Sequence, residues 1–193
     1  MTYFAAHSEE WSHDAVKRYL MNETLSGKEV WEHSRGVIEP SEQGYVVIDD
    51  FVLDKDYSYD IELVRHLYSG KEKAQIKGIG IVTCLYVNPE RGQYWLIDYR
   101  IYDPERDGKS KITHAKEMLE KVIKHKQLEF GYVAFDAWYA AMELLKIVES
   151  YGKIYSCTIK GDRKVCEQSS FSPEDKPHYL RVNELLWSTT EEH

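Results

Sequence analysis

Hydrophobic and polar positions along the chain predict a region of strands followed by strands and helices in alternation. Residues 54–75 are polar, and we expect a loop there with a helical turn near residues 61–67. Apolar residues at alternating or consecutive positions predict strands over residues 45–53, 77–87, 93–102, 131–136 and 153–160. Apolar residues spaced by three and four predict helices over residues 112–127 and 138–151. The predicted order is β-β-β-α-β-α-β.

Two short helices are predicted ahead of this region, within residues 9–38. Ser26-Gly27-Lys28-Glu29 is a capping box, in which the serine and glutamate side chains each accept a hydrogen bond from a free backbone amide. Two helices joined near residues 22–25 fit a helix-turn-helix or a packing appendage, and their mixed charges favour the appendage.

Composition limits the class of protein. With 193 residues and 42% hydrophobic content, the chain is long enough for one domain with appendages and a real core. No run of about 18 apolar residues predicts a membrane span, and the N-terminus lacks the features of a signal peptide. Cys84, Cys157 and Cys166 include no C-x-x-C pair, so we expect reduced thiols in a cytoplasmic protein rather than a zinc site.

The net charge of −8 counts against a simple nucleic-acid binder, because an acidic protein repels the phosphate backbone at long range. Local basic clusters do occur, and each is first interpreted as solvated surface. They are Lys71, Lys73 and Lys77; Lys121, Lys124 and Lys126; and Lys160, Arg163 and Lys164.

Two aspartates end hydrophobic runs that predict strands. Asp50 closes residues 45–50, and Asp136 closes residues 132–136. Carboxylates at the ends of buried strands need compensation, and a divalent cation such as Mg²⁺ or Mn²⁺ is the usual one. The alternative is that Asp50 begins a turn and Asp136 caps the following helix. Asp49 and Asp50 point to opposite faces of a strand, so only one of them can face a metal.

Residues 47–55 resemble the first catalytic block of cut-and-paste insertion-sequence transposases of the DDE type, in which a hydrophobic strand precedes Asp-Asp-Thr. Residues 132–140 resemble the second block, in which Asp is followed by a small residue and an aromatic one. Residues 77–83 and 159–164 resemble the second strand and a later basic turn of that family, whereas Phe51 stands at the usual Thr position.

The resemblance and the element order imply an α/β, ribonuclease H-like mixed sheet with small N-terminal helices. Residues 1–40 would form the helical segment, residues 41–165 the catalytic core, and residues 166–193 the start of an incomplete β-rich insertion. In this topology the first and fourth strands are neighbours, which would bring Asp50 and Asp136 within reach of a shared metal.

The resemblance implies that Asp50 and Asp136 are catalytic residues that bind Mg²⁺ or Mn²⁺, with Asp49 as the alternative first ligand. The third acid of the family is a glutamate on a later helix. Asp98 is a weaker candidate for a metal ligand, because we expect a mid-strand residue that faces solvent; it or a C-terminal glutamate would be the third acid if the chain were an unrelated nuclease. Three glutamates near the C-terminus lack the helical context and are not assigned; they are Glu184, Glu191 and Glu192.

The function implied is metal-dependent cleavage and transfer of transposon-end DNA, here by an inactive fragment that lacks the third acid. Two alternatives stay open: a non-catalytic DNA-binding or regulatory fragment of a transposase, and an unrelated metal-dependent nuclease. The sequence also leaves open which DNA sequence is the target and whether the chain forms a homo-oligomer.

Overall fold

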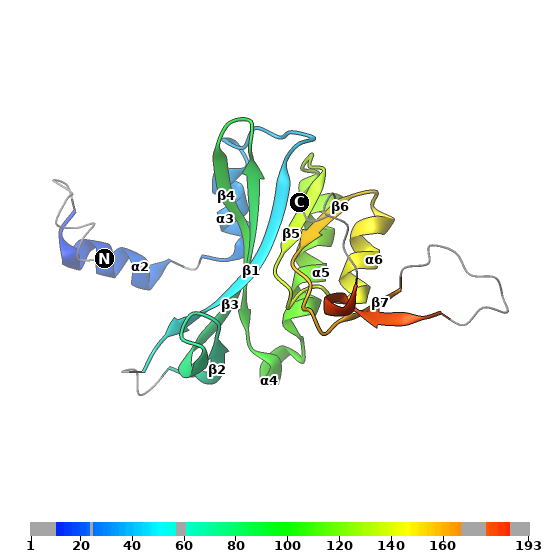
Figure 1. Cartoon of the computed structure of the whole chain (residues 1–193). Helices are drawn as coiled ribbons and strands as arrows, with labels where there is room; N and C mark the ends of the chain where they lie inside the picture. The colour runs from blue at the N-terminus through cyan, green and yellow to red at the C-terminus, as the bar shows by residue number, and fades with distance from the viewer. Residues whose placement is uncertain (1–10, 24, 57–60, 167–176, 186–193) are drawn as a thin grey trace.

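The centre of the molecule is a mixed sheet of six strands (Figure 1). The structure, a computed structural model, describes residues 11–23, 25–56, 61–166 and 177–185. The sheet has the order β2-β3-β1-β5-β6, and β4 also pairs with β3. Its strands are β1 (Tyr45–Asp54), β2 (Arg65–Ser69), β3 (Ala74–Asn88), β4 (Gln93–Tyr102), β5 (Tyr132–Phe135) and β6 (Ile154–Cys157).

Strand β1 is the point where the sheet changes from antiparallel to parallel pairing. It is antiparallel to β3 on one side and parallel to β5 on the other, and β6 continues the parallel part. The expected neighbourhood of the first strand and the strand that precedes Asp136 is therefore confirmed. Strands β3 and β4 form an antiparallel hairpin, with Gly92 at a positive φ of 63° in the turn.

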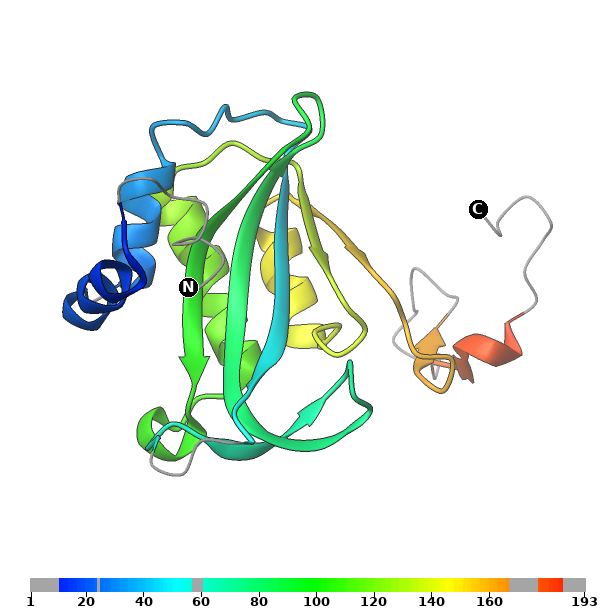
Figure 2. The same ribbon diagram turned by 90° about the vertical axis from the view of Figure 1, so that its left-hand side faces the viewer.

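Helices cover one face of the sheet (Figure 2). The three helices on this face are α3 (Gly27–Ser34), α5 (Lys111–Lys121) and α6 (Met142–Ser150), and α5 continues into a π-helix at Val122–Lys126. Their apolar stripes pack on alternate residues of the strands, such as Val46, Ile48 and Val133, which are fully buried. This layer is the hydrophobic core.

The N-terminal elements agree with the sequence pattern. Helix α2 (His13–Asn22) begins after Ser12, whose hydroxyl accepts a hydrogen bond from the Ala15 amide at 3.2 Å. The capping box of Ser26 and Glu29 is present at the start of α3. Helix α2 projects away from the sheet, whereas α3 packs on β4 (Figure 1).

The polar stretch at residues 54–75 was wrongly interpreted as a loop with a helical turn, because its second half forms β2. This strand pairs with the part of β3 that extends beyond β4. Short polar strands are typical of sheet edges, and long-range pairing decides their structure rather than local periodicity. After β4, a short helix, α4 (Pro104–Asp107), precedes α5.

Some predicted elements are shorter in the structure. Helix α6 begins at Met142 rather than at residue 138, because residues 137–139 form a turn. The last predicted strand, residues 153–160, is shortened to β6. Further along the chain, β8 (Tyr179–Arg181) is followed by a 3₁₀ turn at Val182–Glu184, and β8 pairs with β7 (Lys164–Cys166) in a small separate sheet. Residues 186–193 lie outside the described part of the chain.

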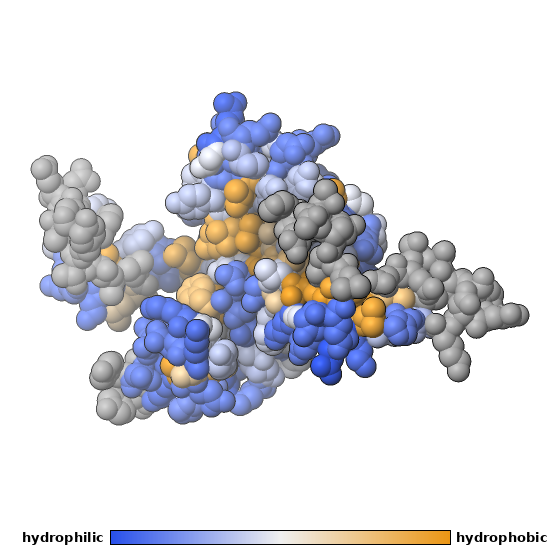
Figure 3. Space-filling view, viewed as in Figure 1, coloured by the Kyte–Doolittle hydropathy of each residue, from blue (hydrophilic) through white to orange (hydrophobic). Residues whose placement is uncertain are grey.

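The other face of the main sheet has no helix from the described residues packed against it (Figure 2). Hydrophobic side chains gather there (Figure 3), and Phe51 and Leu53 of β1 are 49% and 43% exposed. Tyr45 of β1 stacks on Tyr132 of β5 with 4.8 Å between ring centroids. The three cysteines are free, and none of the helices described is long and apolar enough to cross a membrane.

Candidate functional site

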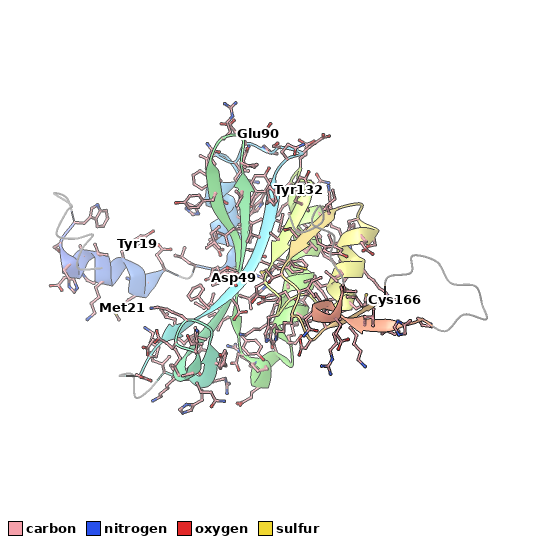
Figure 4. All side chains as sticks on the ribbon, in the orientation of Figure 1. Tyr19, Met21, Asp49, Glu90, Tyr132 and Cys166 are labelled. Carbon is pink, nitrogen blue, oxygen red and sulfur yellow. The ribbon has the colours of Figure 1, made fainter. Side chains whose placement is uncertain are left out.

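The parallel register of β1 and β5 decides which aspartates are neighbours. Val47 is opposite Ala134 and Ile48 is opposite Phe135, which is the last pair of the register, so Asp49 and Asp136 are the residues that follow it on the two chain segments. The charge of Asp136 acts on the Asp49 carboxyl, which agrees with their being close. Neighbouring strands lie about 4.8 Å apart, and residues at the same register level point to the same face. Asp49 and Asp136 therefore share the face that lacks helices, near the centre of the sheet, where Figure 4 labels Asp49.

Asp49 has a carboxylate that resists ionisation. Burial raises the pKa of the Asp49 carboxyl, and the nearby carboxylates of Asp50 and Asp136 raise it further. A hydrogen bond from the Asp50 amide to Asp49 Oδ1 at 2.8 Å and the charge of Lys111 act in the opposite direction. A cation bound between Asp49 and Asp136 would relieve this repulsion.

Asp50 faces the helices and is held by two side chains. Its Oδ2 lies 2.6 Å from Lys111 Nζ, and its Oδ1 accepts a hydrogen bond from the Tyr139 hydroxyl at 2.8 Å. The side chains of Asp50 and Lys111 are only 18% and 14% exposed. Lys111 Nζ also lies 5.4 Å from the ring centroid of Tyr102 and 5.6 Å from that of Trp138. Both carboxylate oxygens of Asp50 are thus already engaged.

The contacts of Asp50 connect β1 with two distant segments. Lys111 is the first residue of α5, and Tyr139 belongs to the turn that follows Asp136. Burial and the Asp50 carboxylate raise the pKa of the Tyr139 hydroxyl, which therefore stays a hydrogen-bond donor. Neither partner was identified from the sequence, because they are separated from Asp50 by 61 and 89 residues and no local pattern marks them.

Asp136 caps the turn that follows β5. Its Oδ1 accepts hydrogen bonds from the backbone amides of Trp138 at 2.9 Å and Tyr139 at 3.3 Å. This is the capping role that the alternative interpretation expected, although it closes a turn before α6 rather than the helix itself. Both bonds use one oxygen, and an ionised carboxylate has about four acceptor positions, so capping and metal binding are compatible.

No third acid joins this pair among the residues described. The described part of the chain contains no group of three or more His, Cys, Asp or Glu side chains arranged to hold a metal. Glu184 instead accepts a hydrogen bond from the Arg181 amide at 3.0 Å. Glu191 and Glu192 lie outside the described residues.

Asp98 was wrongly expected to face solvent. Its side chain is buried, and it forms a two-point ion pair with Arg100, with Oδ1–Nη1 and Oδ2–Nη2 distances of 2.5 and 3.0 Å. Asp98 is opposite Cys84, which is opposite Ile48, so it belongs to the row that faces the helices. The structure therefore places Asp98 on the other face of the sheet from Asp49.

A basic segment reaches the turn after Asp136. The Arg163 guanidinium donates a hydrogen bond to the backbone carbonyl of Ala140. Lys164 of β7 is directly opposite Arg181 of β8, and both side chains are exposed. Like charges in facing positions are unfavourable, and a bound anion would offset the repulsion.

We expect Asp49→Asn to stabilise the metal-free protein at neutral pH by up to about 1 kcal/mol, after allowance for solvent screening. Because folding raises the pKa of the Asp49 carboxyl, this group favours the folded state only while it is protonated, and fully so below the unfolded pKa near 3.9. The contribution is lost as the pH rises through the pKa of the carboxyl in the folded protein. The gain should therefore shrink below about pH 4. Urea unfolding in chelator at pH 3.5 and pH 7 measures it, with Asp54→Asn as the control. An equal gain at both pH values would contradict the repulsion.

Comparison with known proteins gives a distant structural similarity. No protein-family model matches the sequence, and no characterised protein sequence matches it significantly. Part of the chain is similar to a solved structure of piggyBac transposase in a synaptic complex with hairpin DNA, with a TM-score of 0.43 and 14% sequence identity. The similar region covers 65% of this chain and 24% of the transposase chain, so this chain spans about a quarter of that protein.

Proposed function

We propose that this chain carries two carboxylates of a metal-dependent site for DNA strand cleavage and transfer, of the cut-and-paste transposase type. The observation that supports the proposal is the β1–β5 register, whose last pair, Ile48 and Phe135, directly precedes Asp49 and Asp136. The order of the main sheet, with β1 antiparallel to β3 and parallel to β5, supports a ribonuclease H-like core.

In this proposal Asp49, rather than Asp50, is the first metal ligand and Asp136 is the second. Asp50 is engaged by Lys111 and Tyr139, so binding a cation would require breaking a buried ion pair. Asp49 has no cationic partner at hydrogen-bond distance in the structure described; burial and the carboxylates of Asp50 and Asp136 raise its pKa, and the more distant Lys111 lowers it. The ligand roles of Asp50 and Asp136 inferred from the sequence stay predictions.

The two carboxylates offer hard oxygen ligands, which suit Mg²⁺ or Mn²⁺. When bound, such an ion stabilises the negative charge on the attacking or leaving oxygen of a phosphodiester. The residues of the chain hold the ligands in position. Lys111 and Tyr139 fix Asp50 and with it the adjacent Asp49, while the amides of Trp138 and Tyr139 orient Asp136.

The exposed cations of the small sheet would contact the DNA backbone next to this site. Lys164 and Arg181 face each other across β7 and β8, and Arg163 ties this segment to the turn after Asp136. Phosphate contacts of this kind position DNA without reading its sequence.

A second candidate function is a non-catalytic DNA-binding or regulatory role in transposition. The absence of a third metal-binding acid among the described residues favours it. Both functions use DNA as the partner, and they differ in whether the chain itself cleaves a strand.

Metal binding is the direct test of the proposed site. At 10 mM Mn²⁺ we expect a stabilisation of about 1 kcal/mol, or roughly 2–4 °C in Tm, because a ligand that binds only the folded state shifts the unfolding equilibrium. Asp49→Asn/Asp136→Asn should abolish the shift, measured by differential scanning fluorimetry.

The matched control is Asp14→Asn/Asp54→Asn, which removes two exposed carboxylates away from the pair and should keep the shift. Equal Mn²⁺ shifts in the parent and in the Asp49/Asp136 variant would refute the metal site. Loss of the shift in Asp50→Asn with retention in Asp49→Asn would restore Asp50 as the ligand.

A further inference from the structure

A cavity lies on the helix-covered side of the sheet, at the β4 edge. Its volume is about 570 Å³, and it is lined by α3, β4 and the region where α5 becomes the π-helix. The basic and aromatic side chains that line it are Lys28, Trp31, Arg100, Lys121, His125 and Lys126. We call it the α3–β4 pocket.

The α3–β4 pocket carries excess positive charge in a chain whose net charge is −8. Asp98 is the only acidic residue in its lining, and both of its oxygens are bound by the Arg100 guanidinium. Lys28, Lys121 and Lys126 are therefore not neutralised within the lining. An anion is the ligand that such a set of side chains attracts.

Lys126 is held over the pocket by an aromatic ring. Its Nζ lies 4.5 Å from the ring centroid of Trp31, a distance typical of a cation–π contact. Burial lowers the pKa of the Lys126 ammonium, and the charges of Lys121 and Arg100 lower it further, while Asp98 acts in the opposite direction. A bound anion would reduce this mutual repulsion of cations.

The backbone around the pocket departs from regular helix. The chain widens into a π-helix at Val122–Lys126, which carries His125 and Lys126, and Gln127 ends it with a positive φ of 51°. This wider turn is the last one of the helix, and a left-handed residue such as Gln127 is a common way for a helix to end. Its effect is to bring His125 and Lys126 to the pocket.

The N-terminus of α3 is not the source of the anion affinity. The capping box of Ser26 and Glu29 already satisfies amides of its first turn. A Cβ at Gly27 would lie 1.9 Å from Asp98 Oδ1, so glycine allows the helix to pack directly on the Asp98–Arg100 pair. The lysine side chains are the groups that remain for a ligand.

We propose that the α3–β4 pocket binds a backbone phosphate of DNA, as a contact separate from the Asp49–Asp136 site. The choice of DNA as the source of the phosphate rests on the proposed function. Strand β4 lies two strand spacings from β1, about 10 Å, and phosphates follow one another every ~3.4 Å along each strand of a duplex. The pocket lies on the helix-covered side of the sheet and the Asp49–Asp136 pair on the other side, so the DNA segment that fills the pocket is one that passes around the β4 edge.

The test compares two double variants in DNA binding. Lys28→Gln/Lys121→Gln removes two exposed pocket cations, and Lys17→Gln/Lys146→Gln removes two exposed cations from α2 and α6. Fluorescence anisotropy with a labelled 30-base-pair duplex, measured across a salt titration, gives the affinity and its salt dependence. Arg100 is left unchanged because its loss would leave Asp98 buried without a partner.

We expect the pocket variant to bind the duplex about tenfold more weakly at 100 mM salt, with the slope of log K against log salt reduced by roughly 1 to 2 units. The control variant should stay within about twofold of the parent. Equal losses in the two variants, or no binding of the duplex by the parent, would overturn the proposal.

Inorganic phosphate and pyrophosphate form the second arm, monitored by the indole NMR signal of Trp31, which Trp31→Phe assigns. If phosphate at millimolar concentration shifts the Trp31 signal and competes with the duplex for binding, the result supports a phosphate-binding pocket. A shift with phosphate together with an unaffected duplex affinity would show that DNA is the wrong source.

Metal stabilisation separates this inference from the proposed function. The pocket variant should keep the Mn²⁺ shift in Tm. The Asp49→Asn/Asp136→Asn variant should keep the part of the slope of log K against log salt that depends on Lys28 and Lys121. If Mn²⁺ does not shift the Tm but the pocket variant still binds the duplex more weakly, only the cleavage site is refuted. If Mn²⁺ shifts the Tm but the pocket variant binds the duplex as the parent does, only the pocket is refuted.

Discussion

Asp50→Asn should lower the free energy of unfolding by roughly 3 kcal/mol, because it leaves Lys111 without its counter-ion in a mostly buried position. Asparagine has nearly the same shape, so the loss reports the charge rather than a cavity. Asp49→Asn, one residue earlier on the same strand, should not destabilise the protein. Urea unfolding at pH 7 in the absence of metal measures both variants.

A double-mutant cycle checks the cause of this loss. Lys111→Met alone should also be destabilising, and Asp50→Asn/Lys111→Met should cost less than the sum of the two single changes. A cost below about 1 kcal/mol for Asp50→Asn would show that the ion pair contributes as little as an exposed one. Asp50 would then be available to a metal, and the preference for Asp49 would lose its main support.

The isolated chain is expected to neither nick nor join transposon-end DNA in Mn²⁺. Two carboxylates can hold one ion but fix a second one poorly, so either the attacking or the leaving oxygen lacks stabilisation. The loss of that electrostatic stabilisation corresponds to about 3–4 kcal/mol, or a hundred- to a thousandfold in rate. A strand-cleavage assay with supercoiled and end-labelled DNA measures it.

The controls for this assay are Asp49→Asn and Asp136→Asn. Weak nicking that persists unchanged in both variants is contamination. Robust cleavage by the parent that either substitution abolishes would mean that the chain supplies a third ligand from residues outside the described part, and the expectation of inactivity would be wrong. Cleavage lost only in Asp50→Asn would identify Asp50 as the first ligand.

Local chemistry determined several features from the sequence alone. The capping box, the β3–β4 hairpin and the apolar stripe of α5 depend on residues within a few positions of one another, and each is present in the structure. The strand end before Asp136 was likewise visible as a hydrophobic run that stops at a carboxylate, whereas β1 continues past Asp50 to Asp54. Periodicity also established that Asp49 and Asp50 face opposite ways.

Only the tertiary structure decided which of the two aspartates faces Asp136. That choice depends on the register between β1 and β5 and on which face the helices cover, and no local pattern encodes either one. The partners of Asp50, the burial of Asp98 and the edge strand β2 follow from contacts between residues far apart in the chain. The sequence alone determined that carboxylates follow hydrophobic runs, whereas long-range pairing decided which of them are neighbours, because strand register and helix packing are properties of the whole sheet.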